Sequence, residues 1–273
     1  MTATTPTATS NVTERQLQVG QIPARVLVGG TGEPVLFLHG AGGLMWDPFL
    51  DALAGDYTVY AVEHPGAGEG DALAHLPGIW ELVLFYDELL DALELDTVRV
   101  VGHSFGGMVA AELAANNPRR VSRLVLLAPI GLWRDDAPIP DIAAMPPESL
   151  PGLVLADPNS PLAEMMVPPA DDPQALFEAS TRMASILHFI WPIPDKGLDR
   201  RIHRISAPTL LVWGSKDKLV SPVYAEDFAA RLRTAEISMI DGAGHLPHLE
   251  QPDAARKAVL GFLDDSATAA RGR

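Results

Sequence analysis

Ser104 stands in the pattern Gly-x-Ser-x-Gly, within the segment 102–107 that reads GHSFGG. A serine hydroxyl attacks a carbonyl carbon when a histidine accepts its proton and a carboxylate orients that histidine. The pattern is typical of a sharp strand-to-helix turn, where the two glycines avoid collisions with the crowded backbone and the helix N-terminus supplies N–H groups. The sequence therefore predicts a nucleophilic serine, against the alternative of a glycine-rich turn that only happens to contain a serine.

The partners of this serine are predicted from their order in the chain. When a serine occupies such a turn, the acid and then the histidine follow it in the sequence. Asp217 and His245 each come just past the end of a predicted strand, and parallel strands bring such positions to one edge of a sheet. We therefore predict His245 as the base and Asp217 as the acid that orients it. Asp241, which precedes His245 by four residues, is the rival for the role of the acid.

Two backbone N–H donors are expected near Ser104. The tetrahedral intermediate of acyl transfer carries negative charge on the former carbonyl oxygen, and preorganised N–H groups stabilise that charge. One donor should be the N–H of Phe105, the residue after the serine. The other should come from the loop 39–43, which reads HGAGG after a short apolar run. We predict Ala41 as this second oxyanion-hole donor, with Gly42 as the alternative.

The elements that must position these residues alternate between short apolar strands and helices. This alternation predicts an α/β fold with a parallel sheet that is covered on both faces. The first two strands have the pattern of a hairpin. The predicted strands are 15–20, 22–29, 35–38, 57–62, 97–101, 123–127, 209–213 and 236–240, and the predicted helices are 47–54, 79–93, 108–115, 173–190, 222–232 and 251–263.

The alternation breaks between residues 132 and 203. The stretch from Trp133 to His203 holds 12 of the 24 prolines. A structureless loop of this length is rare in a compact domain, so we predict an inserted subdomain over the carboxyl edge of the sheet, where open α/β sheets bind ligands. The predicted organisation is a disordered tail at 1–12, a core at 13–131 and 204–264, a cap at 132–203 and a flexible tail at 265–273. Candidate pocket residues are Gly42, Trp133, Met165, His188 and Trp191.

Charge and composition limit the partners of the chain. There are 20 basic and 35 acidic residues, and the resulting net charge of −15 disfavours nucleic acid or an anionic membrane as a partner. The absence of cysteine excludes disulfides and thiolate metal sites. Because no signal peptide or membrane-spanning run is recognisable, we expect a cytoplasmic protein. We predict no metal and no cofactor, because the acyl chemistry is complete without one. The expected partner is a small-molecule substrate, and an oligomer is an open alternative.

Four motifs occur in order along the chain: the His39-Gly40 loop, the segment GHSFGG, the strand 208–214 followed by Asp217, and the segment 244–250 that reads GHLPHLE. In this order they resemble the α/β-hydrolase fold family, over about Val12 to Leu263. The resemblance implies an eight-stranded, mostly parallel sheet flanked by helices, an inserted helical cap, and a triad of Ser104, Asp217 and His245. The loop 63–70, EHPGAGEG, departs from the family, because relatives usually read aspartate first and serine last.

The predicted activity is hydrolysis of a carboxylic ester or a lactone through an acyl-enzyme. An aspartate at position 104 would have indicated an epoxide hydrolase or a dehalogenase, and serine disfavours both. The apolar and aromatic residues of the predicted cap favour a small apolar or aromatic substrate, although packing of the cap explains them equally well. Two alternatives stay open. One is a hydrolase of carbon–carbon bonds, of the type that acts on meta-cleavage products of aromatic rings. The other is a receptor that keeps the triad for ligand binding.

Overall fold

A computed structural model describes residues 11–67 and 72–264. The tails predicted at 1–12 and 265–273 lie outside these ranges apart from residues 11 and 12, as do the last three residues of the loop 63–70. The predicted core elements are all present in the described residues, with ends that differ by a few residues from the predicted ones.

Eight strands form one sheet in the order β1-β2-β4-β3-β5-β6-β7-β8. β1 pairs with β2 and β2 with β4 in antiparallel fashion, whereas the other neighbours are parallel. The expectation of an eight-stranded, mostly parallel sheet is confirmed. The strands are β1 Thr13–Val19, β2 Ile22–Gly29, β3 Pro34–Leu38, β4 Thr58–Val62, β5 Val98–His103, β6 Val121–Leu127, β7 Thr209–Gly214 and β8 Ala235–Ile240.

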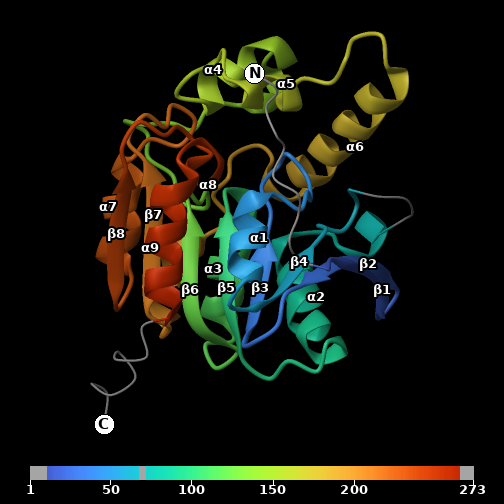
Figure 1. Ribbon diagram of the computed structural model, residues 1–273, viewed down its shortest axis with the longest axis vertical. Helices are drawn as coiled ribbons and strands as arrows, with labels where there is room; N and C mark the ends of the chain where they lie inside the picture. The colour runs from blue at the N-terminus through green and yellow to red at the C-terminus, as the bar shows by residue number, and fades with distance from the viewer. Residues whose placement is uncertain (1–10, 68–71, 265–273) are drawn as a thin grey trace.

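Helices cover both faces of this sheet (Figure 1). Alternate residues of a strand point to opposite faces, so in β3 Val35 and Phe37 pack on one side and Leu36 and Leu38 on the other. The face of Val35 is covered by α1 and α9, and the face of Leu36 by α2, α3 and α7. These helices and the short α8 are α1 Pro48–Ala54, α2 Ile79–Ala92, α3 Phe105–Asn116, α7 Val223–Arg231, α8 Pro247–Glu250 and α9 Pro252–Asp264.

Residues 128–208, between β6 and β7, are called the insertion below. They contain α4 Leu150–Val154, α5 Pro161–Met166 and α6 Pro173–Ile190, which lie at the same end of the sheet in Figure 1. α6 has the predicted bounds. α4 and α5 were not predicted, because helices of five and six residues are too short to show a helical period. Short 3₁₀ helices occupy Ala72–His75, Ile142–Ala144, Pro147–Ser149, Leu198–Arg200 and Ile202–Arg204.

Candidate active site

Ser104 lies on the turn between β5 and α3, and its backbone is strained. Its φ of 53° and ψ of −114° belong to a region that residues other than glycine rarely adopt. A Cβ atom at Gly102 would lie 2.5 Å from the carbonyl oxygen of Gly106, and a Cβ at Gly106 would lie 2.2 Å from the carbonyl oxygen of Leu38. Both positions therefore require glycine, as the Gly-x-Ser-x-Gly pattern predicts.

The three polar side chains predicted to act together form one hydrogen-bonded chain. The Oγ atom of Ser104 lies 2.9 Å from Nε2 of His245, and Nδ1 of His245 lies 2.8 Å from Oδ2 of Asp217. All three residues are buried, with exposed fractions of 8%, 3% and 5% for Ser104, His245 and Asp217. They follow β5, β8 and β7, so three parallel strands bring them together at one edge of the sheet.

The orientation of Asp217 is set by its own loop. Its Oδ1 atom accepts the backbone N–H groups of Leu219 and Val220, both at 2.9 Å, which leaves Oδ2 directed at the imidazole. The rival acid Asp241 instead accepts a hydrogen bond from the hydroxyl of Ser215 at 3.2 Å. The geometry thus selects Asp217 over Asp241 as the partner of the histidine.

The predicted oxyanion-hole residues Ala41 and Phe105 both border the cavity next to Ser104. Phe105 is the first residue of α3, where a helix leaves its N–H groups without a partner inside the helix. Among the described residues, neither the N–H of Ala41 nor that of Phe105 donates to a protein acceptor. A hydrogen bond from Gly43 N–H to the carbonyl of Gly40, 3.3 Å long, closes the turn that carries Ala41.

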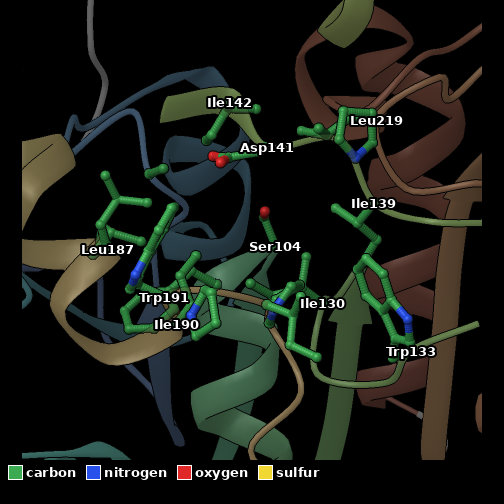
Figure 2. Close-up of a pocket in the computed structure, with 17 residues that line it drawn as sticks. Ser104, Ile130, Trp133, Ile139, Asp141, Ile142, Leu187, Ile190, Trp191 and Leu219 are labelled. Carbon is green, nitrogen blue, oxygen red and sulfur yellow. The ribbon is translucent and has the colours of Figure 1, made fainter. Parts of the chain in front are cut away.

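A cavity of about 160 Å³ lies beside Ser104 (Figure 2). Two of the predicted pocket residues, Trp133 and Trp191, line it. The other three are not among the described lining residues. Met165 is 60% exposed on α5, the Nε2 atom of His188 lies 2.7 Å from the carbonyl oxygen of Leu76, and Gly42 has no side chain to reach the cavity. The unpredicted apolar lining comes mainly from irregular segments and the end of α6, and includes Ile130, Ile139, Ile142, Ile186, Leu187, Ile190 and Ile193.

A family model described as the alpha/beta hydrolase family matches residues 35–258 of this chain. The match spans more than half of the sequence and includes Ser104, Asp217 and His245. The chain belongs to the alpha/beta hydrolase family.

Curated relatives of this α/β hydrolase differ widely in length. The chain is 30% identical over 264 residues to the polyketide synthase ThaQ of Burkholderia thailandensis. The matched region covers 92% of this chain and 13% of that protein. It is 26% identical to a 2-hydroxy-6-oxononadienedioate/2-hydroxy-6-oxononatrienedioate hydrolase of Cupriavidus pinatubonensis, over 86% of this chain and 88% of that one. The chain spans 13%, 61% and 65% of the lengths of three relatives that are 28–30% identical to it.

Solved structures share the fold of this α/β hydrolase. The naproxen esterase from Bacillus subtilis superposes with a TM-score of 0.74 over 94% of this chain and 93% of that one, at 18% sequence identity. At this identity the likeness concerns the fold alone.

Behind the Ala41 loop, this α/β hydrolase contains a buried network in which the sequence analysis missed the parts of His64 and Tyr86. His39 donates from Nδ1 to the carbonyl of Gly40 at 2.6 Å, and its Nε2 accepts the backbone N–H of His64 at 3.1 Å. His64 donates from Nε2 to the carbonyl of His39 at 2.7 Å, and its Nδ1 accepts the hydroxyl of Tyr86 at 2.5 Å. Burial lowers the pKa of His39 to about 4 and the pKa of His64 well below its usual value. Both rings are therefore neutral, as these bonds require. For His64, the sequence signal was its place in the loop that departs from the family pattern.

Two further histidines pack beside His245. The Nε2 atom of His103 lies 2.9 Å from the carbonyl oxygen of His245, and the rings of His103 and His248 are 4.8 Å apart. In the described part of the chain, Nδ1 of His248 has no hydrogen-bond partner. Burial lowers the pKa of His248 to about 3 and that of His103 well below its usual value. Both side chains are therefore uncharged neighbours of His245 at neutral pH.

No group of three or more His, Cys, Asp or Glu residues within 11–67 and 72–264 is placed to hold a metal ion. Within the same ranges, no helix is both long and apolar enough to cross a membrane.

Proposed function

We propose that this protein is a serine hydrolase that cleaves a carboxylic ester or lactone through an acyl-enzyme. The observation that supports this function is the buried hydrogen-bonded chain, with 2.9 Å between Ser104 Oγ and His245 Nε2 and 2.8 Å between His245 Nδ1 and Asp217 Oδ2. Such a chain lets the histidine take the proton of the serine as the hydroxyl attacks a carbonyl carbon.

Each residue has a defined part in the proposed reaction. Ser104 Oγ bonds to the carbonyl carbon while its proton moves to Nε2 of His245, and Asp217 stabilises the imidazolium that forms. The N–H groups of Ala41 and Phe105 hold the negative oxygen of the tetrahedral intermediate. His245 then gives its proton to the leaving alkoxide, which departs as the alcohol. Water, deprotonated by His245, attacks the acyl-enzyme, releases the carboxylic acid and restores the Ser104 hydroxyl.

The size and the lining of the cavity support the proposal that the substrate carries a small apolar or aromatic group. An apolar cavity of about 150 Å³ binds benzene in another protein, and the cavity beside Ser104 measures about 160 Å³. Most of its lining comes from the insertion, including Trp133, Ile139 and Ile190. We therefore propose that residues 132–203 act as a cap that shapes the substrate site.

A second candidate function is hydrolysis of a carbon–carbon bond. It is favoured by the relative from Cupriavidus pinatubonensis, whose name describes a hydrolase of 2-hydroxy-6-oxo dienedioates. Comparing a ring-cleavage dienoate with p-nitrophenyl acyl esters separates the two functions. Preferred turnover of the dienoate would replace the ester hydrolase by the carbon–carbon hydrolase.

The decisive variant is Ser104→Ala. We expect it to lose ester hydrolysis by a factor of 10⁴ or more, on the order found when a triad residue is removed, and to lose labelling by a fluorophosphonate. Ser180→Ala is the matched control, because Ser180 lies exposed on α6 and its hydroxyl donates to the carbonyl of Leu176 in the same helix. Equal turnover by Ser104→Ala and the parent protein would reject the proposed function.

A further inference from the structure

Among the described residues that line the cavity beside Ser104, Asp141 is the one with a charged side chain. It lies in the insertion, just before the 3₁₀ helix Ile142–Ala144. Figure 2 shows its carboxylate and the hydroxyl of Ser104 directed into the same space. The other described lining residues are uncharged, and most of them are Ile, Leu, Pro or Trp. The cavity is thus apolar with a single negative charge.

Among the described residues, one oxygen of this carboxylate forms a hydrogen bond. Oδ1 of Asp141 accepts the backbone N–H of Ala143 at 3.0 Å and so caps the 3₁₀ helix. In the described chain, Asp141 forms no ion pair and its Oδ2 accepts no hydrogen bond. The basic residue Arg182 does not belong to the described lining of the cavity. Its side chain lies against Gly43, and its guanidinium is 3.9 Å from the carboxylate of Glu178. The charge of Asp141 is therefore available to a ligand in the cavity.

We propose that Asp141 is a specificity-determining residue, which makes the site favour esters with a cationic group and disfavour esters with a carboxylate. This inference rests on the proposed function, which puts the reacting carbonyl at Ser104. The carboxylate of Asp141 is exposed, so solvent weakens its interaction with a charged ligand, and the expected preference is roughly threefold to tenfold. The indole rings of Trp133 and Trp191 on the same cavity act in the same direction, because aromatic faces attract cations.

The same charge bears on the competing carbon–carbon function. A ring-cleavage dienoate carries a carboxylate, and no described residue of the cavity lining is basic. Asp141 would repel this carboxylate, and no basic side chain of the described lining would attract it.

The test uses three aryl acetates that differ in charge, of which the cationic and the neutral one have the same shape. They are 4-(trimethylammoniomethyl)phenyl acetate, the isosteric neutral 4-neopentylphenyl acetate, and 4-(carboxymethyl)phenyl acetate, in which a methylene insulates the reacting ester from the charge. The variant Asp141→Asn removes the charge and keeps an oxygen for the N–H of Ala143. Glu148→Gln is the matched control, since Glu148 is exposed on the same insertion and does not line the cavity.

The readout is the ratio of kcat/KM between substrates, which cancels any general loss of activity. We expect the cation-to-neutral ratio to fall threefold to tenfold in Asp141→Asn and the anion-to-neutral ratio to rise by a similar factor, with Glu148→Gln unchanged. Ratios that are the same in Asp141→Asn and the parent protein would overturn the role of Asp141 while leaving the ester hydrolase intact.

A binding measurement separates the two proposals. The product phenols, 4-(trimethylammoniomethyl)phenol and 4-(carboxymethyl)phenol, need no turnover to bind. If none of the acetates is hydrolysed, the proposed function fails, but calorimetric Kd values still decide on Asp141. A preference for the cationic phenol that falls in Asp141→Asn supports the inference, and an unchanged preference overturns it.

Discussion

The backbone N–H of His245 donates a hydrogen bond to the carbonyl oxygen of Val154, with a length of 2.7 Å. Val154 ends α4, so the loop that carries His245 is joined directly to the insertion. Glu250 adds a second link, because its carboxylate accepts the N–H of Ala156 at 2.7 Å and the N–H of Gly244 at 2.9 Å. The insertion therefore holds the histidine loop in place in addition to lining the cavity.

Replacing Glu250 by alanine tests this link. The change leaves three N–H groups, those of Gly244, Leu246 and Ala156, without their carboxylate acceptor. We expect the free energy of unfolding to fall by about 1–3 kcal/mol and kcat to fall about tenfold with a smaller change in KM, because the histidine is displaced. Glu226→Ala, at an exposed position of α7, is the control. A parental kcat in Glu250→Ala would contradict the prediction.

Tyr86→Phe tests the buried network behind the Ala41 loop. Without the hydroxyl of Tyr86, Nδ1 of buried His64 loses its hydrogen-bond donor, which costs about 1–3 kcal/mol. We expect reduced stability and reduced kcat, since His64 holds the carbonyl of His39 beside the predicted oxyanion donor. Tyr60→Phe on β4 is the matched change at a half-buried tyrosine. If thermal unfolding and ester kinetics show the two variants to be alike, the network has no such role.

Two glycine substitutions should have opposite effects. A Cβ at Gly106 would meet backbone oxygens of Leu38 and His39 at 2.2 Å and 2.5 Å, which cannot move aside. Gly106→Ala should therefore fail to fold or lose most of its activity. A Cβ at Gly261, within α9, meets nothing within 4 Å. Gly261→Ala should stabilise the protein by about 0.8–1 kcal/mol, the difference in helix propensity. Denaturant unfolding measures both, and a destabilised Gly261→Ala would contradict the second expectation.

Stability should fall as the pH drops from 7 to 5. Burial lowers the pKa of His39 to about 4 and of His248 to about 3, and also lowers the pKa of His64 and His103, from a usual value of 6.5. Below pH 6.5 these histidines bind more protons in the unfolded chain than in the folded protein. The stability that they contribute is therefore fully present above pH 6.5 and is lost as the pH falls toward their pKa values in the folded protein. For a histidine that stays neutral when folded, the loss at pH 5 is about 2 kcal/mol.

Asp47 opposes this trend. Burial raises the pKa of Asp47 to about 6 from 3.8. The stability that Asp47 contributes is therefore fully present below pH 3.8 and is lost as the pH rises through 6. It is one group against four, and we expect a net decrease in the urea midpoint between pH 7 and pH 5. His248→Leu should make this decrease smaller, because the unfolded chain then has one histidine fewer to protonate. A midpoint that stays constant or rises on acidification would be incompatible with the neutral buried histidines.

Much of the fold could be predicted because its signals are local. Continuous apolar runs such as 35–38 and 209–213 are typical of strands buried on both faces, and β3 and β7 have that environment. α6 was predicted with its bounds because its helical pattern is 18 residues long. The short α4 and α5 were missed, since a single turn or two carries no measurable period.

The sequence by itself determined the turn that carries Ser104, the parallel sheet and the two strand ends from which Asp217 and His245 come, because turn glycines and apolar periods act over a few residues. Only the tertiary structure decided between Asp217 and Asp241, brought Asp141 to the cavity, and joined His245 to Val154. These outcomes depend on the direction of side chains and backbone groups from segments far apart in the chain. Such contacts form only when the packed sheet and the insertion meet, and no local pattern of residues encodes them.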